Sequence, residues 1–392
     1  MRRAYIGVDG IAKRITKGYI GVNGVARAII KAYIGIGGVA RPCWSYKDVE
    51  RYGTITALSN GRNKLAATKI GDYVLFGGGS NNTLTSGTQF EAVDAYNSSL
   101  VRGMPTSLSQ ARAYLAATSV GDYALFGGGL GPKPSGVGTT EYATVDAYDT
   151  SLTRSIPTAL SAVRQELAAT SVGNYALFAG GKSSSNFTGC STVDAYNTSL
   201  TRSTPAALST SRWALAAVSL GSYALFGGGA TGATSYDSTA TVDAYDRSLT
   251  RSTPTALSQA RAYLEGAATK KHALFGGGYI TDPYSTVDAY NTSLTRSNPA
   301  ALNQARCRLA GVSYDDFALF GGGSRTHSNI DPYSTVDVYD AKLTRKNPSG
   351  LSVARSGLAA TNMYGFILFG GGYVRDNGGA SSVVDAYMVT LG

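Results

Sequence analysis

GDYALFGGG occupies residues 121–129, and six other stretches repeat it. They are GDYVLFGGG (71–79), GNYALFAGG (173–181), GSYALFGGG (221–229), KKHALFGGG (270–278), DDFALFGGG (315–323) and YGFILFGGG (364–372). Their phenylalanines lie at positions 76, 126, 178, 226, 275, 320 and 369, so neighbouring copies are 45 to 52 residues apart. A period of this length is typical of arrays whose copies each form one supersecondary unit. We therefore treat the chain as seven similar units.

Within one unit, short apolar segments alternate with turn residues. The second copy contains YLAATSV (114–120), YALF (123–126), TVDAY (144–148) and TRSIPTAL (153–160). Each segment is too short for an ordinary helix, which predicts four strands. A small twisted sheet has two apolar faces, and packing each sheet on its neighbours in a closed ring buries both. We expect the small Ala pair of LAAT on the innermost strand, and the glycines where two backbones approach closely.

These units resemble the kelch-repeat family over residues 42–392. The resemblance rests on a diglycine after an apolar strand (Gly127–Gly128), a downstream Tyr-Asp or Tyr-Asn pair (Tyr148–Asp149), and an Arg that opens the next copy (Arg164). It implies an all-β, seven-bladed, kelch-like β-propeller. The chain departs from the family at Arg102, Arg154 and Arg202, which stand where the family usually has a Trp.

The two ends of the array predict how the ring closes. The last copy ends at VVDAYMVTLG and lacks the fourth segment, while RYGTITALSNGR (51–62) precedes the first copy without a partner. We expect a strand near Thr54–Leu58 to complete the seventh blade.

The segment between the second and third strands varies among the copies, whereas the other turns are short and nearly constant. In a four-stranded blade these segments and the links between blades share one face. The segments are rich in Ser, Thr, Asn and Gly, and they contain eight aromatic residues: Phe90, Tyr142, Phe187, Tyr236, Tyr279, Tyr284, Tyr333 and Tyr373. Variable loops on a constant frame are typical of a recognition surface. The alternative is free drift of surface loops.

An arginine precedes the innermost strand of every copy, at Arg62, Arg112, Arg164, Arg212, Arg261, Arg306 and Arg355. Converging near the channel mouth, these guanidinium groups would bind an anionic ligand such as a phosphate- or carboxylate-bearing glycan. Each copy also carries one Asp in its VDAY-type segment, at Asp94, Asp146, Asp194, Asp243, Asp288, Asp337 and Asp385. Equal numbers favour the alternative, buried structural pairing between blades.

Residues 1–41 repeat on a shorter scale. AYIGVDGIAKRI (4–15), GYIGVNGVARAI (18–29) and AYIGIGGVARPC (32–43) recur every 14 residues, and Asp9-Gly10, Asn23-Gly24 and Gly37-Gly38 are two-residue hairpin turns. This segment has a net charge of +7, and the rest of the chain only +3. Three such hairpins are too small to be stable alone. We expect them to dock on a partner or to form a homo-oligomer, and they resemble N-terminal segments of phage and prophage tail proteins.

Composition excludes several functions. The body lacks the basic stripe of a nucleic-acid-binding protein, and no apolar run approaches 18 residues, so we expect no membrane insertion. The N-terminus does not resemble a signal peptide. Cys43, Cys190 and Cys307 have no metal-site spacing. The only two histidines, His272 and His327, have no evident partner set for a metal, so no metal or cofactor is expected.

These observations predict a non-enzymatic display protein on the surface of a phage tail or virion. Its variable loops would recognise a bacterial surface glycan or protein, and residues 1–41 would attach it to a tail or baseplate component. One alternative is an intracellular kelch adaptor, located in the cytoplasm, that binds a protein partner. Another is a metal-dependent oxidase, an activity known among kelch propellers.

Overall fold

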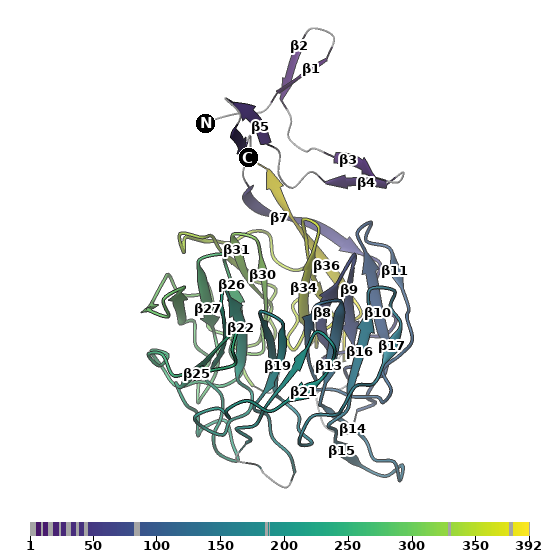
Figure 1. Ribbon diagram of the computed structural model, residues 1–392, viewed down its shortest axis with the longest axis vertical. Helices are drawn as coiled ribbons and strands as arrows, with labels where there is room; N and C mark the ends of the chain where they lie inside the picture. The colour runs from purple at the N-terminus through teal and green to yellow at the C-terminus, as the bar shows by residue number, and fades with distance from the viewer. Residues whose placement is uncertain are drawn as a thin grey trace.

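The computed structural model describes six short strands between residues 5 and 42 and then residues 46–391, apart from 82–86, 185–186, 188, 328–330 and 376–378. The described residues form strands and connecting segments, and no helix among them is long and apolar enough to cross a membrane. Seven four-stranded antiparallel sheets are arranged around an axis as a β-propeller (Figure 1). This confirms the predicted fold.

The blades are numbered along the chain. Blade 1 is β8–β11 (Ala66–Ile70, Tyr73–Gly77, Val93–Asn97, Arg102–Gly103), and blade 2 is β12, β13, β16 and β17 (Ala116–Val120, Tyr123–Gly127, Val145–Asp149, Arg154–Ser155). Blade 3 is β18–β21 (Ala168–Val172, Tyr175–Ala179, Val193–Asn197, Arg202–Ser203), and blade 4 is β22–β25 (Ala216–Leu220, Tyr223–Gly227, Val242–Asp246, Arg251–Ser252). Blade 5 is β26–β29 (Glu265–Ala268, His272–Gly276, Val287–Asn291, Arg296–Ser297), and blade 6 is β30–β33 (Ala310–Tyr314, Phe317–Gly321, Val336–Tyr339, Arg345–Lys346). Blade 7 is β34, β35, β36 and β7 (Ala359–Met363, Phe366–Gly370, Val384–Leu391, Tyr46–Ile55).

The fourth strands are shorter than the sequence predicted. TRSIPTAL (153–160) contributes only Arg154–Ser155 to β17, because the chain then leaves the sheet to cross to the next blade. In six blades the turn before this strand is set by an Asn or Asp side chain. The Asn97 Oδ1, for instance, accepts hydrogen bonds from the amides of Ser99 and Val101. This local bond explains why the turn is nearly constant in sequence.

The hydrophobic core lies between blades rather than inside one layer. The Ala66, Leu75 and Val93 side chains of blade 1 pack with Phe126 and Tyr148 of blade 2. Equivalent clusters lie at every other interface, including the one where Leu65 and Phe76 of blade 1 meet Leu368 and Val384 of blade 7. This seventh cluster shows that the ring is closed.

The glycines after each Phe lie at the blade interface. A Cβ on Gly77 would meet the Phe126 ring of the next blade, and one on Gly78 would meet the Arg112 carbonyl. Gly79 N donates a hydrogen bond of 2.8 Å to that same carbonyl. The motif therefore gives one blade room to approach the next, as the sequence predicted.

The seventh blade is completed by a strand from before the first repeat. β7 pairs with β36, and Thr54 lies opposite Asp385. The prediction that a strand near Thr54–Leu58 completes this blade is confirmed, but the bounds differ. The strand is longer than expected, beginning at Tyr46 and ending at Ile55. A bulge at Tyr52 lets Arg51 reach the Asp385 carboxylate at 2.8 Å. The closing strand thus brings its own arginine to the last blade.

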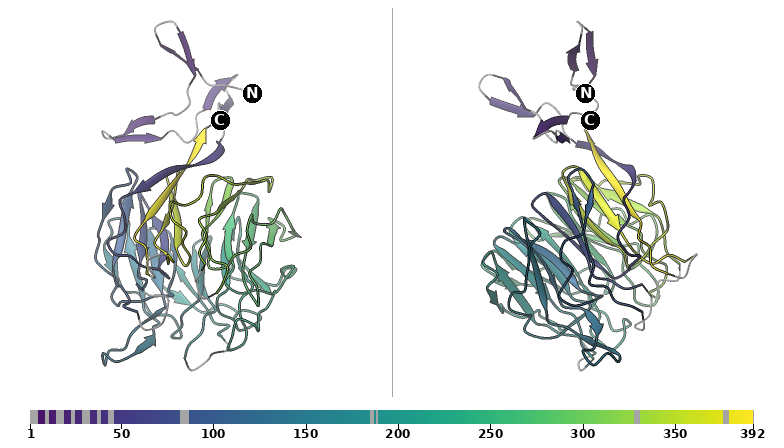
Figure 2. Two further views of the ribbon diagram at one scale, coloured as in Figure 1. Left: turned by 180° about the vertical axis from the view of Figure 1, so that it is seen from behind. Right: turned by 90° about the vertical axis from the view of Figure 1, so that its right-hand side faces the viewer.

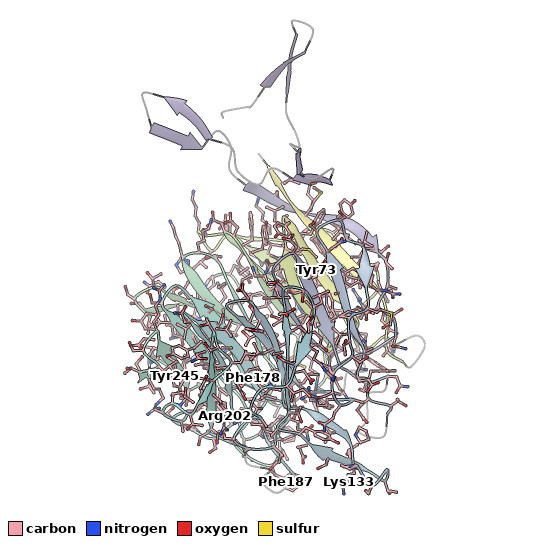
Figure 3. The ribbon with its side chains drawn as sticks, turned by 45° about the vertical axis from the view of Figure 1, so that its right-hand side comes forward. Tyr73, Lys133, Phe178, Phe187, Arg202 and Tyr245 are labelled. Atoms are coloured by element: carbon pink, nitrogen blue, oxygen red, sulfur yellow. The ribbon has the colours of Figure 1, made fainter. Side chains whose placement is uncertain are left out.

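The propeller has two unlike faces (Figures 1 and 2). The loop face carries the second-to-third-strand loops and the blade-to-blade links, which pair with each other at Ala113 and Leu130, for example. The turn face carries the short turns, together with the start of β7 and the end of β36. Figure 3 shows Phe187 and Lys133 of the loop face at the end of the molecule remote from Tyr73. In blade 2 the loop contains a further hairpin, β14 and β15 (Leu130–Pro132, Thr139–Glu141).

The N-terminal repeats form three separate hairpins. These are β1–β2 (Tyr5–Val8, Ile11–Arg14), β3–β4 (Tyr19–Val22, Val25–Ala28) and β5–β6 (Tyr33–Ile36, Val39–Pro42). Tyr5, Tyr19 and Tyr33 each begin the first strand of a hairpin, so the repeated sequence has a repeated structure. The turn residues Asp9-Gly10, Asn23-Gly24 and Gly37-Gly38, and also Cys43, lie outside the described residues.

Candidate functional site: the loop face and channel mouth

The seven arginines predicted near the channel mouth are completely buried. Each has 0% of its surface exposed, and so does its partner aspartate. The Arg212 Nη2, for instance, lies 2.7 Å from the Asp243 Oδ2 and also donates to the Phe226 carbonyl at 3.1 Å. In this structure a ligand cannot reach these guanidinium groups, so the structural alternative is the one that the geometry supports.

Each aspartate also binds a second arginine on the fourth strand. The Arg251 Nη1 lies 2.9 Å from the other oxygen of Asp243, and the amide of Ser209, in the link from blade 3, donates to the same oxygen at 3.1 Å. Arg102, Arg154 and Arg202, which stand where kelch repeats usually have a Trp, therefore each complete an Arg–Asp–Arg group. The expected pairing between blades needs correction, since Arg212 and Asp243 belong to one blade and its incoming link. The Arg212 carbonyl makes the contact with blade 3, through Gly181.

The eight predicted aromatic residues lie on the loop face in three structural positions. Phe90, Tyr142, Tyr284 and Tyr333 are half-buried and equivalent: each bonds through its backbone to a motif glycine and to the arginine of the next link. Tyr279 and Tyr373 directly follow the glycines; Tyr279 is buried and Tyr373 is half-buried. Only Phe187 (58%) and Tyr236 (56%) are largely exposed. These two are the aromatic side chains best placed to meet a partner.

A group of residues that the sequence analysis did not identify surrounds the axis on this face. Two residues after each buried arginine, the link turns toward the channel. We call these seven positions the mouth ring, and they are Lys64, Tyr114, Glu166, Ala214, Tyr263, Arg308 and Gly357. A pattern in the sequence could have identified these positions. Every copy contains Arg-x-x-Leu, in which the Arg and the Leu are constant, and the third residue, which is the mouth-ring residue, varies.

The backbone of the mouth ring is a closed circle of hydrogen bonds. The backbone amide of each member donates to the backbone carbonyl of the member before it. The Tyr114 amide donates to the Lys64 carbonyl at 2.9 Å, and the circle closes where the Lys64 amide donates to the Gly357 carbonyl at 2.8 Å. Every member has a left-handed backbone, with φ between 50° and 60°. Six of the seven are not glycine, although glycine adopts this conformation at the lowest cost.

Two cationic side chains of the mouth ring lie against its two tyrosines. The Lys64 Nζ lies 4.5 Å from the centre of the Tyr114 ring, and the Arg308 Cζ lies 4.1 Å from that of Tyr263. Between them, Glu166 is paired with Lys182 at 2.9 Å. Lys182 also lies over the Trp213 ring at 3.3 Å, and Trp213 contacts Tyr263 edge-on. Cation–π contacts of this kind hold long cationic side chains in place.

Burial changes the ionisation of this cluster. It lowers the pKa of Lys64 to about 8, and the positive charge of Arg308 acts in the same direction. Burial also raises the pKa of the Tyr114 and Tyr263 hydroxyls. At neutral pH the tyrosines are therefore neutral donors, and Lys64 is close to its titration range.

The mouth ring encloses a cavity of 170 Å³ whose floor is formed by a leucine from each blade, such as Leu65 and Leu115. A second cavity of 240 Å³ continues along the axis and is lined by the Ala pairs of the innermost strands, as expected. Glu265 borders both cavities and stands where other copies have Ala, as at Ala66 and Ala116. Burial raises the pKa of its carboxyl to about 7.

A separate groove of 480 Å³ lies on the loop face between blades 6 and 7. Tyr333 and Val374 line it, together with Arg325, Asp331 and Arg375. The Arg375 Nη1 donates to the Asp331 Oδ1 at 2.6 Å, which ties the two loops together. Of the predicted aromatic residues, the structure brings Tyr333 to this groove.

The two histidines are not brought together in a metal site. His272 begins β27, where other copies have Tyr, and His327 stacks on Tyr279 with ring centres 5.0 Å apart. Among the residues described here, no three His, Cys, Asp or Glu side chains form a group that could hold a metal ion.

Comparison with known proteins supports the architecture alone. No family model matches the chain, and no curated protein matches its sequence. The solved structure of YjhT is similar, with a TM-score of 0.56 and 10% sequence identity over 85% of this chain and 96% of that one. At this identity the likeness shows a shared fold and nothing about ligand or activity.

Proposed function

We propose that this protein is a non-enzymatic adhesin on a phage tail or virion surface, and that its loop face binds a bacterial surface ligand. The observation that carries the proposal is the separation of the two faces. The loops that differ among the copies, with the exposed Phe187 and Tyr236, occupy one face. The first and last strands of the propeller, β7 and β36, leave from the other.

This arrangement is what a display protein requires. The Arg–Asp–Arg groups and the interblade cores hold the loops on a stiff frame, so loop sequence can change without loss of the core. Because Tyr46 lies on the turn face, an attachment made through residues 1–41 leaves the loop face open. The basic charge of that segment, and its hairpins, support attachment to an acidic tail or baseplate component.

The test is binding of the purified full-length chain to bacterial envelope fractions and, separately, to cytosolic extract. We expect saturable binding to an envelope fraction. The double variant Phe187→Ala/Tyr236→Ala should weaken it about tenfold, since exposed aromatic anchors dominate many interfaces. Tyr52→Ala is the matched control, because Tyr52 is similarly exposed (54%) but lies on the outer strand β7.

Two outcomes would contradict the proposal. If the chain bound a cytosolic protein and no envelope fraction, the intracellular adaptor would be favoured instead. If Tyr52→Ala weakened envelope binding as much as the double variant did, the loop face would not be the binding surface.

A further inference from the structure

The mouth ring keeps an unfavourable backbone at every blade. A left-handed conformation costs a non-glycine residue roughly 1 kcal/mol or more, and glycine would remove that cost at each position. Among the seven positions of the mouth ring, only Gly357 is a glycine. The other six positions carry Lys, Tyr, Glu, Ala, Tyr and Arg. The backbone conformation is therefore the same in every blade, whereas the side chain varies.

A second set of left-handed residues shows what a structural reason looks like. In blades 1 to 6 the turn before the fourth strand contains a left-handed leucine with φ between 59° and 65°: Leu100, Leu152, Leu200, Leu249, Leu294 and Leu343. Here the residue is leucine in each of these copies, and several of these leucines pack against the interblade cores. Packing selects the same residue in all six of these turns, whereas the mouth ring has Lys, Tyr, Glu, Ala, Tyr, Arg and Gly. A packing role does not explain that variation.

The order of residues around the mouth ring places two cations beside a gap. Arg308 of blade 6 and Lys64 of blade 1 flank Gly357 of blade 7, which has no side chain. The Arg308 guanidinium is held against Tyr263, and its Nε donates to the His327 carbonyl at 2.7 Å. The Tyr114 and Tyr263 rings form the adjoining walls.

We propose that this slot, above Gly357 and between Arg308 and Lys64, binds the oxyanion of an acidic sugar, with the sugar ring against Tyr114 or Tyr263. A planar guanidinium and an ammonium are suited to a carboxylate or phosphate, and aromatic faces suit the apolar face of a sugar. The 170 Å³ cavity is smaller than the about 300–1,000 Å³ of pockets that enclose a drug-sized ligand, so it suits one small ligand group and not a folded partner. The inference deepens the proposed function and rests on it. It also replaces the seven buried arginines as the anion site.

The test compares galacturonate with galactose, which differ at the carboxylate, and includes glycerol 3-phosphate to distinguish a carboxylate from a phosphate. Calorimetry on the full-length chain should detect binding of galacturonate or glycerol 3-phosphate and much weaker binding of galactose. Arg308→Met should weaken binding of the acidic probe about tenfold to a hundredfold, as loss of a charged hydrogen-bond donor does.

A variant at Gly357 tests the slot directly. Gly357→Glu adds a carboxylate beside the two cations, and we expect it to abolish binding of the acidic probe. The substitution is sterically possible, because the nearest atom to a Cβ there is 3.8 Å away and Glu166 already occupies the equivalent position in blade 3. Gly357→Ala introduces the same backbone strain without the charge, so it is the matched control and should bind normally.

The outcomes separate this inference from the proposed function. If the chain binds envelopes but neither acidic probe competes, and if Arg308→Met and Gly357→Glu bind envelopes like the unaltered protein, the slot is not the site and the inference is overturned. Envelope binding would still stand in that case. If no envelope fraction is bound while galacturonate binds and Gly357→Glu abolishes it, the slot is supported and the adhesin proposal fails.

Discussion

At the scale of single residues, the ionisable groups of this propeller fall into two classes, those with several polar partners and those with few. In the Arg–Asp–Arg groups the carboxylate is well satisfied: Asp243, for example, accepts from Arg212, Arg251 and the Ser209 amide, whereas the buried Arg212 Nε has no hydrogen-bond partner within the described part of the chain. Removing one partner from a buried pair of this kind typically costs about 3–5 kcal/mol. Glu265 is different, because among the described residues its carboxylate accepts a hydrogen bond only from the neighbouring Gly266 amide, at 3.3 Å. It stands in the channel, where six other copies have Ala.

Glu265 should therefore make the stability of the protein depend on pH. Its pKa is about 7 in the folded chain, against 4.5 for an unperturbed Glu. The folded state binds more protons between these values, so stability falls as the pH rises from about 4.5 to about 7. Glu265→Ala should be more stable than the unaltered chain by up to about 3 kcal/mol at pH 8 and nearly equal at pH 4.5.

Urea denaturation at both pH values measures this effect. Glu265→Gln keeps the size of the side chain and removes its charge, so it should reproduce the gain at pH 8. If both variants were equally or less stable than the unaltered chain at pH 8, the carboxylate would have a stabilising partner, and the interpretation would be wrong.

At the scale of elements, blade 7 differs from the others because its strands come from both ends of the propeller. β36 is longer than its counterparts, and its outer neighbour β7 extends with it to Leu391 and Tyr46. Val49 and Val389 of this extension pack against Phe317 of blade 6. The closing strand therefore contacts two blades. It pairs with β36 in the sheet of blade 7, and its Val49 side chain packs against blade 6.

Truncation tests this closure. Deleting residues 1–55 removes β7, leaves Asp385 without Arg51 and exposes the edge of β36. We expect a loss of about 3 kcal/mol or more in the free energy of unfolding, together with aggregation, because an uncovered strand edge pairs with other chains. Deleting residues 1–44 keeps β7 and should melt like the full-length chain. Identical thermal melts for both truncations would contradict this account.

At the scale of the whole molecule, the ring has two different faces. One rim carries every variable loop, and the opposite rim carries the short turns and the exit of both ends of the propeller (Figure 1). The mouth ring closes the first rim around the axis, so loops from all blades surround one small charged cavity. A surface of this kind can change its specificity blade by blade, while the frame stays constant.

The difference between the two faces predicts how a fused protein domain affects binding. A fluorescent protein fused after residue 392 follows β36 on the turn face and should leave envelope binding unchanged. The same domain inserted between Ser135 and Gly136, at the exposed tip of the β14–β15 hairpin, should reduce binding at least about tenfold by obstruction. Both fusions should fold, which thermal melts would verify. Loss of binding only in the C-terminal fusion would place the ligand on the opposite face.

The sequence by itself determined the number of blades, the strands within them and the strand that closes the ring. These features depend on local patterns, namely the short apolar segments, the Asn and Asp turns and the glycines at the blade interface, and the copies repeat them seven times. It also contained the equal sets of Arg and Asp. It did not show where each arginine points, because burial depends on the neighbouring blade.

Only the tertiary structure decided which residues meet at the axis. Lys64, Gly357 and Arg308 are far apart in the chain, and they become neighbours because the ring brings the first and last blades together. The seven arginines that the sequence had placed at the mouth are buried against the aspartates of their own blades, and the residues two positions later line the cavity. The arginine and the residue two positions later lie on one short link but in different surroundings, and no pattern within one copy shows which of them faces the cavity.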